Sequence, residues 1–103
     1  MGLSVGIITF NEEKRLERTL ESVKSFADEV IIVDSGSTDK THEIAQKFSA
    51  NFFVESWKGY GLQKNSVIDK CKEDWILLID ADEVISPELK NKIINARMDR
   101  NDC

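Results

Sequence analysis

The stretch that most constrains the fold is a run of five apolar residues, Trp75 to Ile79, that leads directly into Asp80-Ala81-Asp82. An unbroken apolar run of this length predicts a strand buried on both faces, as in a parallel sheet covered by helices. In such sheets, ligands bind at the carboxyl ends of the strands. We therefore expect Asp80 and Asp82 at a ligand-binding edge.

Two carboxylates one residue apart can face the same pocket from a turn at the end of a strand. Hard oxygen ligands of this kind suit Mg²⁺ or Mn²⁺, so Asp80 and Asp82 suggest a metal-bridged diphosphate site. The alternative is that they are ordinary turn and helix-capping residues. With 19 acidic residues among 103, so short a motif also arises by chance and must be weighed with the rest of the chain.

Composition is that of a globular protein, with 41% hydrophobic and 32% charged residues. The length allows one domain, 1–103, or part of a larger one. The net charge of −5 argues against a nucleic-acid surface, which would be basic, although a metal ion can still attract an anionic ligand. Cys71 and Cys103 form no CxxC pattern, which favours a reducing, cytoplasmic compartment. No apolar run approaches the ~20 residues of a membrane helix.

Strands and helices are expected to alternate four times along the chain. Runs rich in β-branched and apolar residues predict strands over 3–9, 29–34, 51–55 and 75–79. Apolar residues at helical spacing predict four helices. The first covers 13–26 with Asn11 as its cap, the second follows a cap at Ser37, and the third covers 62–72. The fourth follows Ser86, and Pro87 takes its first helical position.

Short connections and right-handed crossovers turn this alternation into a parallel, three-layer α/β sheet. We expect strand order 3-2-1-4, which brings Thr9 and Asn11 beside Asp80 and Asp82 at a switch point between the first and fourth strands. The fourth strand would be an edge unless more chain follows, and so apolar an edge favours aggregation. The pattern hints at a longer protein and leaves open whether this edge pairs with a second copy.

Polar side chains follow the strands at the expected ligand-binding edge. Asp34 could accept hydrogen bonds from a base or ribose, while the small residues from Ser35 to Asp39 would let a ligand approach the backbone. An ordinary turn with a helix cap explains the same residues equally well. Lys64 could pair with phosphate oxygens, although a lone helical lysine is usually solvated. Trp57 and Trp75 are expected to cover edges of the core rather than bind sugars.

Four blocks of the sequence together resemble the N-terminal half of family 2 glycosyltransferases. In order, they are Ser4 to Glu12, Val30 to Thr41, Lys64-Asn65, and Leu78 to Asp82. Their order and spacing match over about 3–88. Within the family, the stretches 35–39 and 59–65 are most similar to bacterial enzymes that add glucose to the lipopolysaccharide inner core.

This resemblance implies a GT-A fold, of which the present sheet would be the Rossmann-like half. It implies inverting transfer from a nucleotide-diphosphate sugar, for which a UDP-sugar is expected, to a glycan or lipid-linked acceptor in cell-envelope polysaccharide or lipopolysaccharide biosynthesis. The reaction would be cytoplasmic, and whether the complete protein sits peripherally on the inner face of the membrane is left open.

On the nucleoside side, the resemblance implies that Thr9 and Asn11 line the pocket and that Asp34 holds the base. Many relatives carry a second acid directly after this aspartate. Here Ser35 takes that place, so the hydrogen-bond pattern to the base is open.

On the phosphate side, the resemblance implies that Lys64 contacts the donor, that Asp80 contacts the ribose or a metal-bound water, and that Asp82 ligates Mn²⁺ or Mg²⁺. The family's catalytic base and most of its acceptor site come from a later half, and we find no candidate base in these 103 residues. We therefore expect a donor-binding half without a catalytic residue and with little or no transferase activity alone.

Three other classes compete with this interpretation. A non-catalytic nucleotide- or metal-binding module would keep the fold without the chemistry. A receiver-like signalling domain would need acids after the first strand and a lysine after a fifth. A phosphatase with a DxD nucleophile would place that motif after the first strand, whereas here Asp80 and Asp82 follow the fourth.

Overall fold

The computed structural model describes residues 2–100, and the side chains of residues 2–96. Four parallel strands form one sheet in the order β3-β2-β1-β4. The strands are β1 (Leu3–Thr9), β2 (Glu29–Asp34), β3 (Asn51–Val54) and β4 (Trp75–Asp80). The predicted parallel sheet and its strand order are both confirmed.

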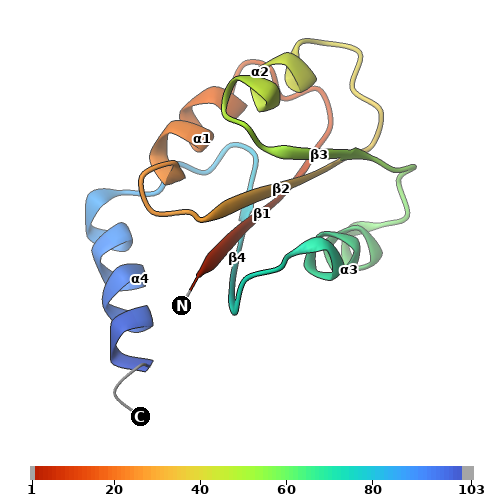
Figure 1. The fold of residues 1–103 in the computed structure, drawn as a ribbon. Coiled ribbons are helices and arrows are strands. Elements are labelled where there is room, and N and C mark those ends of the chain that lie inside the picture. Colours follow the sequence, from red (N-terminus) through yellow and green to blue (C-terminus); the bar gives the residue numbers. More distant parts are fainter. Residues whose placement is uncertain (1, 101–103) are drawn as a thin grey trace.

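Helices alternate with the strands along the chain and lie on both sides of the sheet. They are α1 (Leu16–Val23), α2 (Thr41–Lys47), α3 (Tyr60–Lys70) and α4 (Pro87–Arg100). Figure 1 shows α1 and α2 together over one face of the sheet, α3 over the other face, and α4 leading away toward the C-terminus. This is the predicted three-layer arrangement. Within residues 2–100, no helix combines the length and the hydropathy needed to cross a bilayer.

The main core lies between the sheet and the layer formed by α1 and α2. The apolar stripe of α1 is buried there as predicted, and Ile93 and Ile94 of α4 pack against the same cluster. On the opposite face, a smaller cluster joins Val67 of α3 to β2. Cys71, a free thiol, packs against this second cluster. Cys103 lies outside the described residues.

The edge strand β4 departs from the prediction of a strand buried on both faces. Its side chains alternate, and Ile76 and Leu78 are 38% and 37% exposed. The reason is that α3 packs chiefly over β1 and β2, so one face of β4 is left partly uncovered by the described residues.

The first two helices begin later than their sequence signals indicated. Residues 13–15 form a turn before α1, and Asn11 is not a helix cap, since it has φ 52° and its side chain bonds to the loop after β2. Ser37 does not cap α2 either; Oδ1 of Asp39 accepts the N–H of Thr41 at 3.0 Å. By contrast, Ser86 caps α4 as predicted, with Oγ accepting the N–H of Leu89 at 3.1 Å.

Gly6 permits the close approach of α3 to the centre of the sheet. A Cβ atom at this position would lie 2.4 Å from Cγ1 of Val67 and 2.8 Å from Cδ2 of Leu78, closer than packed carbon atoms can come. The lack of a side chain at Gly6 therefore determines how closely α3 packs on the sheet, and with it the height of the α3 residues above the sheet.

We predict that Gly6→Ala destabilises the protein by about 1–3 kcal/mol, because the added methyl group overpacks the contact between β1 and α3. The free energy of unfolding in urea would measure this. Gly61→Ala is the matched control: a methyl group at that position would have no atom within 4 Å, and alanine is the better helix former by ~1 kcal/mol. Equal unfolding midpoints for Gly6→Ala and the wild type would contradict the prediction.

Candidate functional site

A cleft of about 940 Å³ opens at the carboxyl ends of the strands. Parts of the chain far apart in sequence meet there because all four strands run parallel. The lining residues are Ile8, Thr9, Phe10, Glu12, Arg15, Ser35, Trp57, Tyr60, Lys64, Asp80, Ala81 and Asp82. The structure thus brings together Thr9, Ser35, Lys64, Asp80 and Asp82 among the predicted site residues, whereas Asn11 and Asp34 are not part of this lining.

The turn after β4 presents two available carboxylates on a fixed backbone. Oγ1 of the buried Thr19 donates to the carbonyl oxygen of Ala81 at 2.7 Å, and Oε1 of Glu83 accepts the N–H of Asp80 at 2.8 Å. The side chains of Asp80 and Asp82 are exposed. Within the described part of the chain, neither carboxylate takes part in a hydrogen bond or an ion pair.

These two carboxylates suit a divalent cation for which the protein supplies only some of the ligands. Among the described residues, no group of three or more His, Cys, Asp or Glu side chains is arranged to hold a metal ion. Mg²⁺ typically keeps several waters and is bound by one or two carboxylates together with substrate phosphates. Asp80 and Asp82 would supply that protein share, with a diphosphate and water completing the ligand set.

Side chains of both charges surround the acidic turn. Two of them, Glu12 and Arg15, were not predicted from the sequence as site residues. Burial raises the pKa of the Glu12 carboxyl; Arg15 opposes this shift, while Asp82 and Asp39 add to it. Nε of Arg15 lies 3.5 Å from Oε1 of Glu12. A cation placed near Asp82 would relieve the repulsion among these acids, and Arg15 with Lys64 offers positive charge in the same cleft.

The carboxylate of Asp34 is committed to the protein itself. Asp34 is 1% exposed. Its Oδ1 accepts from Oγ1 of Thr9 at 2.6 Å and from Oγ of Ser37 at 2.5 Å, and its Oδ2 accepts from the N–H groups of Gly36 at 2.8 Å and Ser37 at 2.6 Å. This geometry favours the ordered turn that the sequence left open as an alternative, and it leaves Ser35 as the residue of that turn that lines the cleft.

Asn11 joins the loops that follow β1 and β2. Its N–H donates to Oγ of Ser37 at 2.7 Å, and its Oδ1 accepts the N–H of Thr38 at 2.8 Å. The N–H of Glu12 donates to Oγ1 of Thr41 at 2.9 Å in the same region. Together these bonds hold the two loops beside the cleft in a fixed relation.

An aromatic pair, Trp57 and Tyr60, lines the cleft and was missed by sequence reasoning. The ring centroids are 4.9 Å apart and the planes are perpendicular, at 89°. The expectation that Trp57 covers the core is wrong, because its side chain is 52% exposed, whereas Trp75 packs against the main core as expected. The available signal was the pair of glycines, Gly59 and Gly61, that flank an aromatic residue in a polar loop.

Polar contacts on α3 fix the loop that carries Trp57. The buried side chain of Gln63 donates from Nε2 to the carbonyl oxygen of Glu55 and accepts the N–H of Lys58 at Oε1, both at 3.3 Å. Hydrogen bonds from Lys70, Ser66 and Lys58 lower the pKa of the Glu55 carboxyl to about 2.

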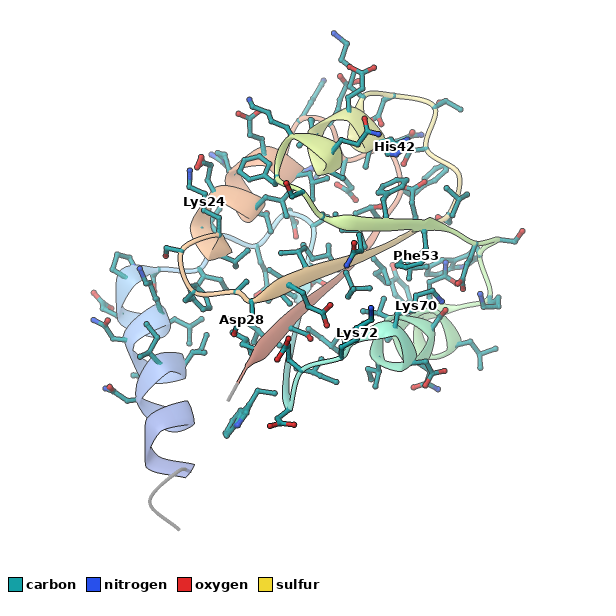
Figure 2. All side chains as sticks on the ribbon, viewed as in Figure 1. Lys24, Asp28, His42, Phe53, Lys70 and Lys72 are labelled. Atoms are coloured by element: carbon teal, nitrogen blue, oxygen red, sulfur yellow. The ribbon has the colours of Figure 1, made fainter. Side chains whose placement is uncertain are left out.

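A cationic side chain also crosses from α3 to the edge of the sheet. Nζ of Lys70 lies 5.2 Å from the centroid of the Phe53 ring, and Figure 2 shows the two side chains next to each other. This contact and the ion pair of Lys70 with Glu55 tie the start of the loop to α3.

The arrangement can be compared with known proteins. The family model described as Glycosyl transferase family 2 matches residues 4–103. The chain belongs to this family. The predicted resemblance is therefore confirmed, and with it the assignment to an enzyme family. The sheet with order 3-2-1-4 is the Rossmann-like half of the GT-A fold, which the solved structural neighbours share.

Two curated relatives of this family 2 chain come from bacteria. An uncharacterized glycosyltransferase of Rickettsia bellii is 54% identical over 91 residues, which are 88% of this chain and 31% of that protein. The lipopolysaccharide core biosynthesis glycosyltransferase LpsC of Rhizobium meliloti is 40% identical over 93 residues, covering 85% of this chain and 34% of that protein. The chain thus spans about a third of the length of these relatives.

Two solved structures superimpose on the chain. TarS of S. aureus has a TM-score of 0.74 at 27% identity, covering 97% of this chain and 20% of TarS. Glucosyl-3-phosphoglycerate synthase of Mycobacterium tuberculosis, crystallised with Mn²⁺, UDP and glucosyl-3-phosphoglycerate, has a TM-score of 0.67 at 27% identity, covering 78% of this chain and 33% of that one.

We predict that Thr19→Val lowers the free energy of unfolding by about 1–3 kcal/mol, because the valine matches threonine in shape but leaves the carbonyl of Ala81 without its buried donor. Urea unfolding measures the loss, and faster amide hydrogen exchange over 80–85 would show that the acidic turn has loosened. Thr19→Ser keeps the hydroxyl and should retain slow exchange there. Unchanged exchange in Thr19→Val would refute the positioning role.

We also predict a pH-dependent effect of Glu55→Gln. The folded-state pKa of about 2 lies below the ordinary value of 4.5, so the ionised carboxylate stabilises the fold above pH 4.5, and this contribution is lost as the pH falls toward 2. Thermal melts should show a lower Tm for Glu55→Gln at pH 7 and a narrowing difference below pH 4.5. Glu43→Gln, at an exposed position on α2, is the control; a difference for Glu55→Gln that is independent of pH would contradict the prediction.

Proposed function

We propose that this chain is the donor-binding part of an inverting, metal-dependent glycosyltransferase that takes a UDP-sugar and serves a glycan or lipopolysaccharide-core acceptor. The observation that carries the proposal is the pair of carboxylates, Asp80 and Asp82, which have no partner among the described side chains and lie in a cleft that also holds Arg15 and Lys64. Carboxylates alone would repel a diphosphate. With a divalent cation between them and the phosphates, the same set becomes a binding site.

Each charged residue has a distinct part in this proposal. Asp82 would ligate the cation, and Asp80 would contact the ribose or complete the protein's share of the ligands. Arg15 and Lys64 would pair with phosphate oxygens. When bound, the metal ion acts as a Lewis acid that offsets the charge left on the diphosphate as the bond to the anomeric carbon breaks.

The nucleoside would lie on the side of the cleft formed by the ends of β1 and β2. Ser35 is the residue of the β2 turn that faces it, while Asp34 holds that turn in shape through its hydrogen bonds to Thr9 and Ser37. We therefore reassign Asp34 from direct contact with the base to positioning of the turn. Support for a nucleotide ligand comes from the neighbours crystallised with UDP and Mn²⁺ or Mg²⁺.

The acceptor is proposed from one relative, the lipopolysaccharide core glycosyltransferase of Rhizobium meliloti. Inversion requires a base that deprotonates the attacking hydroxyl of the acceptor. We assign no described residue to that part.

Calorimetric titration with UDP tests the proposal. We expect binding in the presence of Mn²⁺ that is lost on chelation with EDTA, and an affinity at least about tenfold lower for Asp82→Asn, equivalent to a loss of ~1.4 kcal/mol. Asp69→Asn removes the same charge from an exposed site on α3 that does not line the cleft, and should bind UDP normally. Metal-independent binding, or an equal loss in both variants, would overturn the proposal.

A further inference from the structure

The aromatic end of the cleft has no part in the metal and phosphate chemistry proposed above. Four Phe, Trp and Tyr side chains are exposed in the described residues, and Phe10, Trp57 and Tyr60 all line this one cleft; the fourth is Phe53. Exposed rings scattered over a surface need no explanation, but rings gathered in a concave site are typical of ligand binding.

The topology places the loop of Trp57 at a defined distance from the acids. The N–H of Glu55, two residues before Trp57, donates to the carbonyl oxygen of Asp34 at 2.8 Å, so the loop of Trp57 starts beside the turn of Ser35. Asp82 follows β4 at the other end of the sheet order. Three strand spacings separate β3 from β4, roughly 14 Å in total. The cleft therefore carries Trp57 and Tyr60 at the end away from Asp82, which we call its aromatic end, whereas Phe10 follows β1 beside β4 and lies nearer the acids.

The aromatic pair is held in place rather than packed into the core. Gly59 adopts φ 97°, which lets the chain turn into α3 directly after Trp57 and Lys58. The perpendicular contact with Tyr60 restrains the indole, yet half of the Trp57 side chain remains accessible. A flat, apolar surface that is presented in this way suits stacking by a planar ring.

We propose that Trp57, braced by Tyr60, is a stacking surface for the nucleobase of the donor. The inference rests on the proposed function, because it takes the diphosphate to be bound at Asp80 and Asp82. A nucleoside diphosphate has a flat heterocycle at one end and charge at the other, matching the two ends of the cleft. A sugar phosphate would occupy only the ionic end.

The two tryptophans of the chain allow a direct test. Trp75 starts β4 at the amino end of the strand, away from the cleft, so Trp75→Phe leaves Trp57 as the only indole. With Mn²⁺ present, we expect its fluorescence to change saturably with UDP but not with inorganic pyrophosphate or glucose 1-phosphate. Trp57→Phe, which retains only Trp75, should give no response. A response of Trp57 to glucose 1-phosphate instead of UDP would assign the surface to the sugar and overturn the proposal.

Calorimetry separates stacking from phosphate binding. Trp57→Ala should bind UDP roughly tenfold more weakly or worse, as expected for the loss of one base–aromatic contact, with its affinity for pyrophosphate unchanged. Leu62→Ala truncates a comparably exposed residue outside the cleft and should match the wild type. If the wild type binds UDP and Trp57→Ala binds it equally well, only the stacking inference fails. If the wild type binds no UDP, both proposals fail.

Discussion

The central strand β1 is the constraint on which the site depends. It pairs in parallel with both β2 and β4, and the register sets Thr9 against Asp34 on one side and Ile8 against Asp80 on the other. Parallel pairing places the carboxyl ends of all strands along one rim. Residues that are 70 or so positions apart in sequence therefore reach a common cleft without any long loop, and the rim can be built from short turns.

Polar residues at this rim divide into those that hold the turns and those that face the cleft. Asp34 and Thr19 are buried, and their polar atoms bond to the backbone or to other side chains. Asp80 and Asp82 are exposed, and their carboxylates make no such bonds within residues 2–96. Buried polar groups must be satisfied to be tolerated. The first set gives the second set a fixed backbone from which to bind.

The sheet, its strand order and the acidic turn could be predicted from the sequence, because hydrophobic periodicity and the alternation of strands and helices are local features of the chain. It failed where tertiary contacts decide. Asn11 has the local pattern of a helix cap but bonds across to Thr38. The ligand contact of Asp34 stays a prediction, and in the structure its carboxylate accepts hydrogen bonds from Thr9 and from its own turn. The apolar run of β4 predicts that helices bury both faces of the strand, but α3 packs chiefly over β1 and β2 and leaves one face of β4 partly exposed. The aromatic end of the cleft was missed because loop residues carry no periodic signal.

The buried amide of Gln63 has a consequence for affinity. It binds the backbone on both sides of the loop between β3 and α3, at Glu55 and Lys58. Hydrogen bonds are directional, so such a loop resists sliding more than one held by apolar contact alone. A ligand that binds in the cleft would then meet a loop that is already ordered, so little conformational entropy would be lost on association. Preorganisation of this kind increases affinity mainly by lowering the dissociation rate of the ligand.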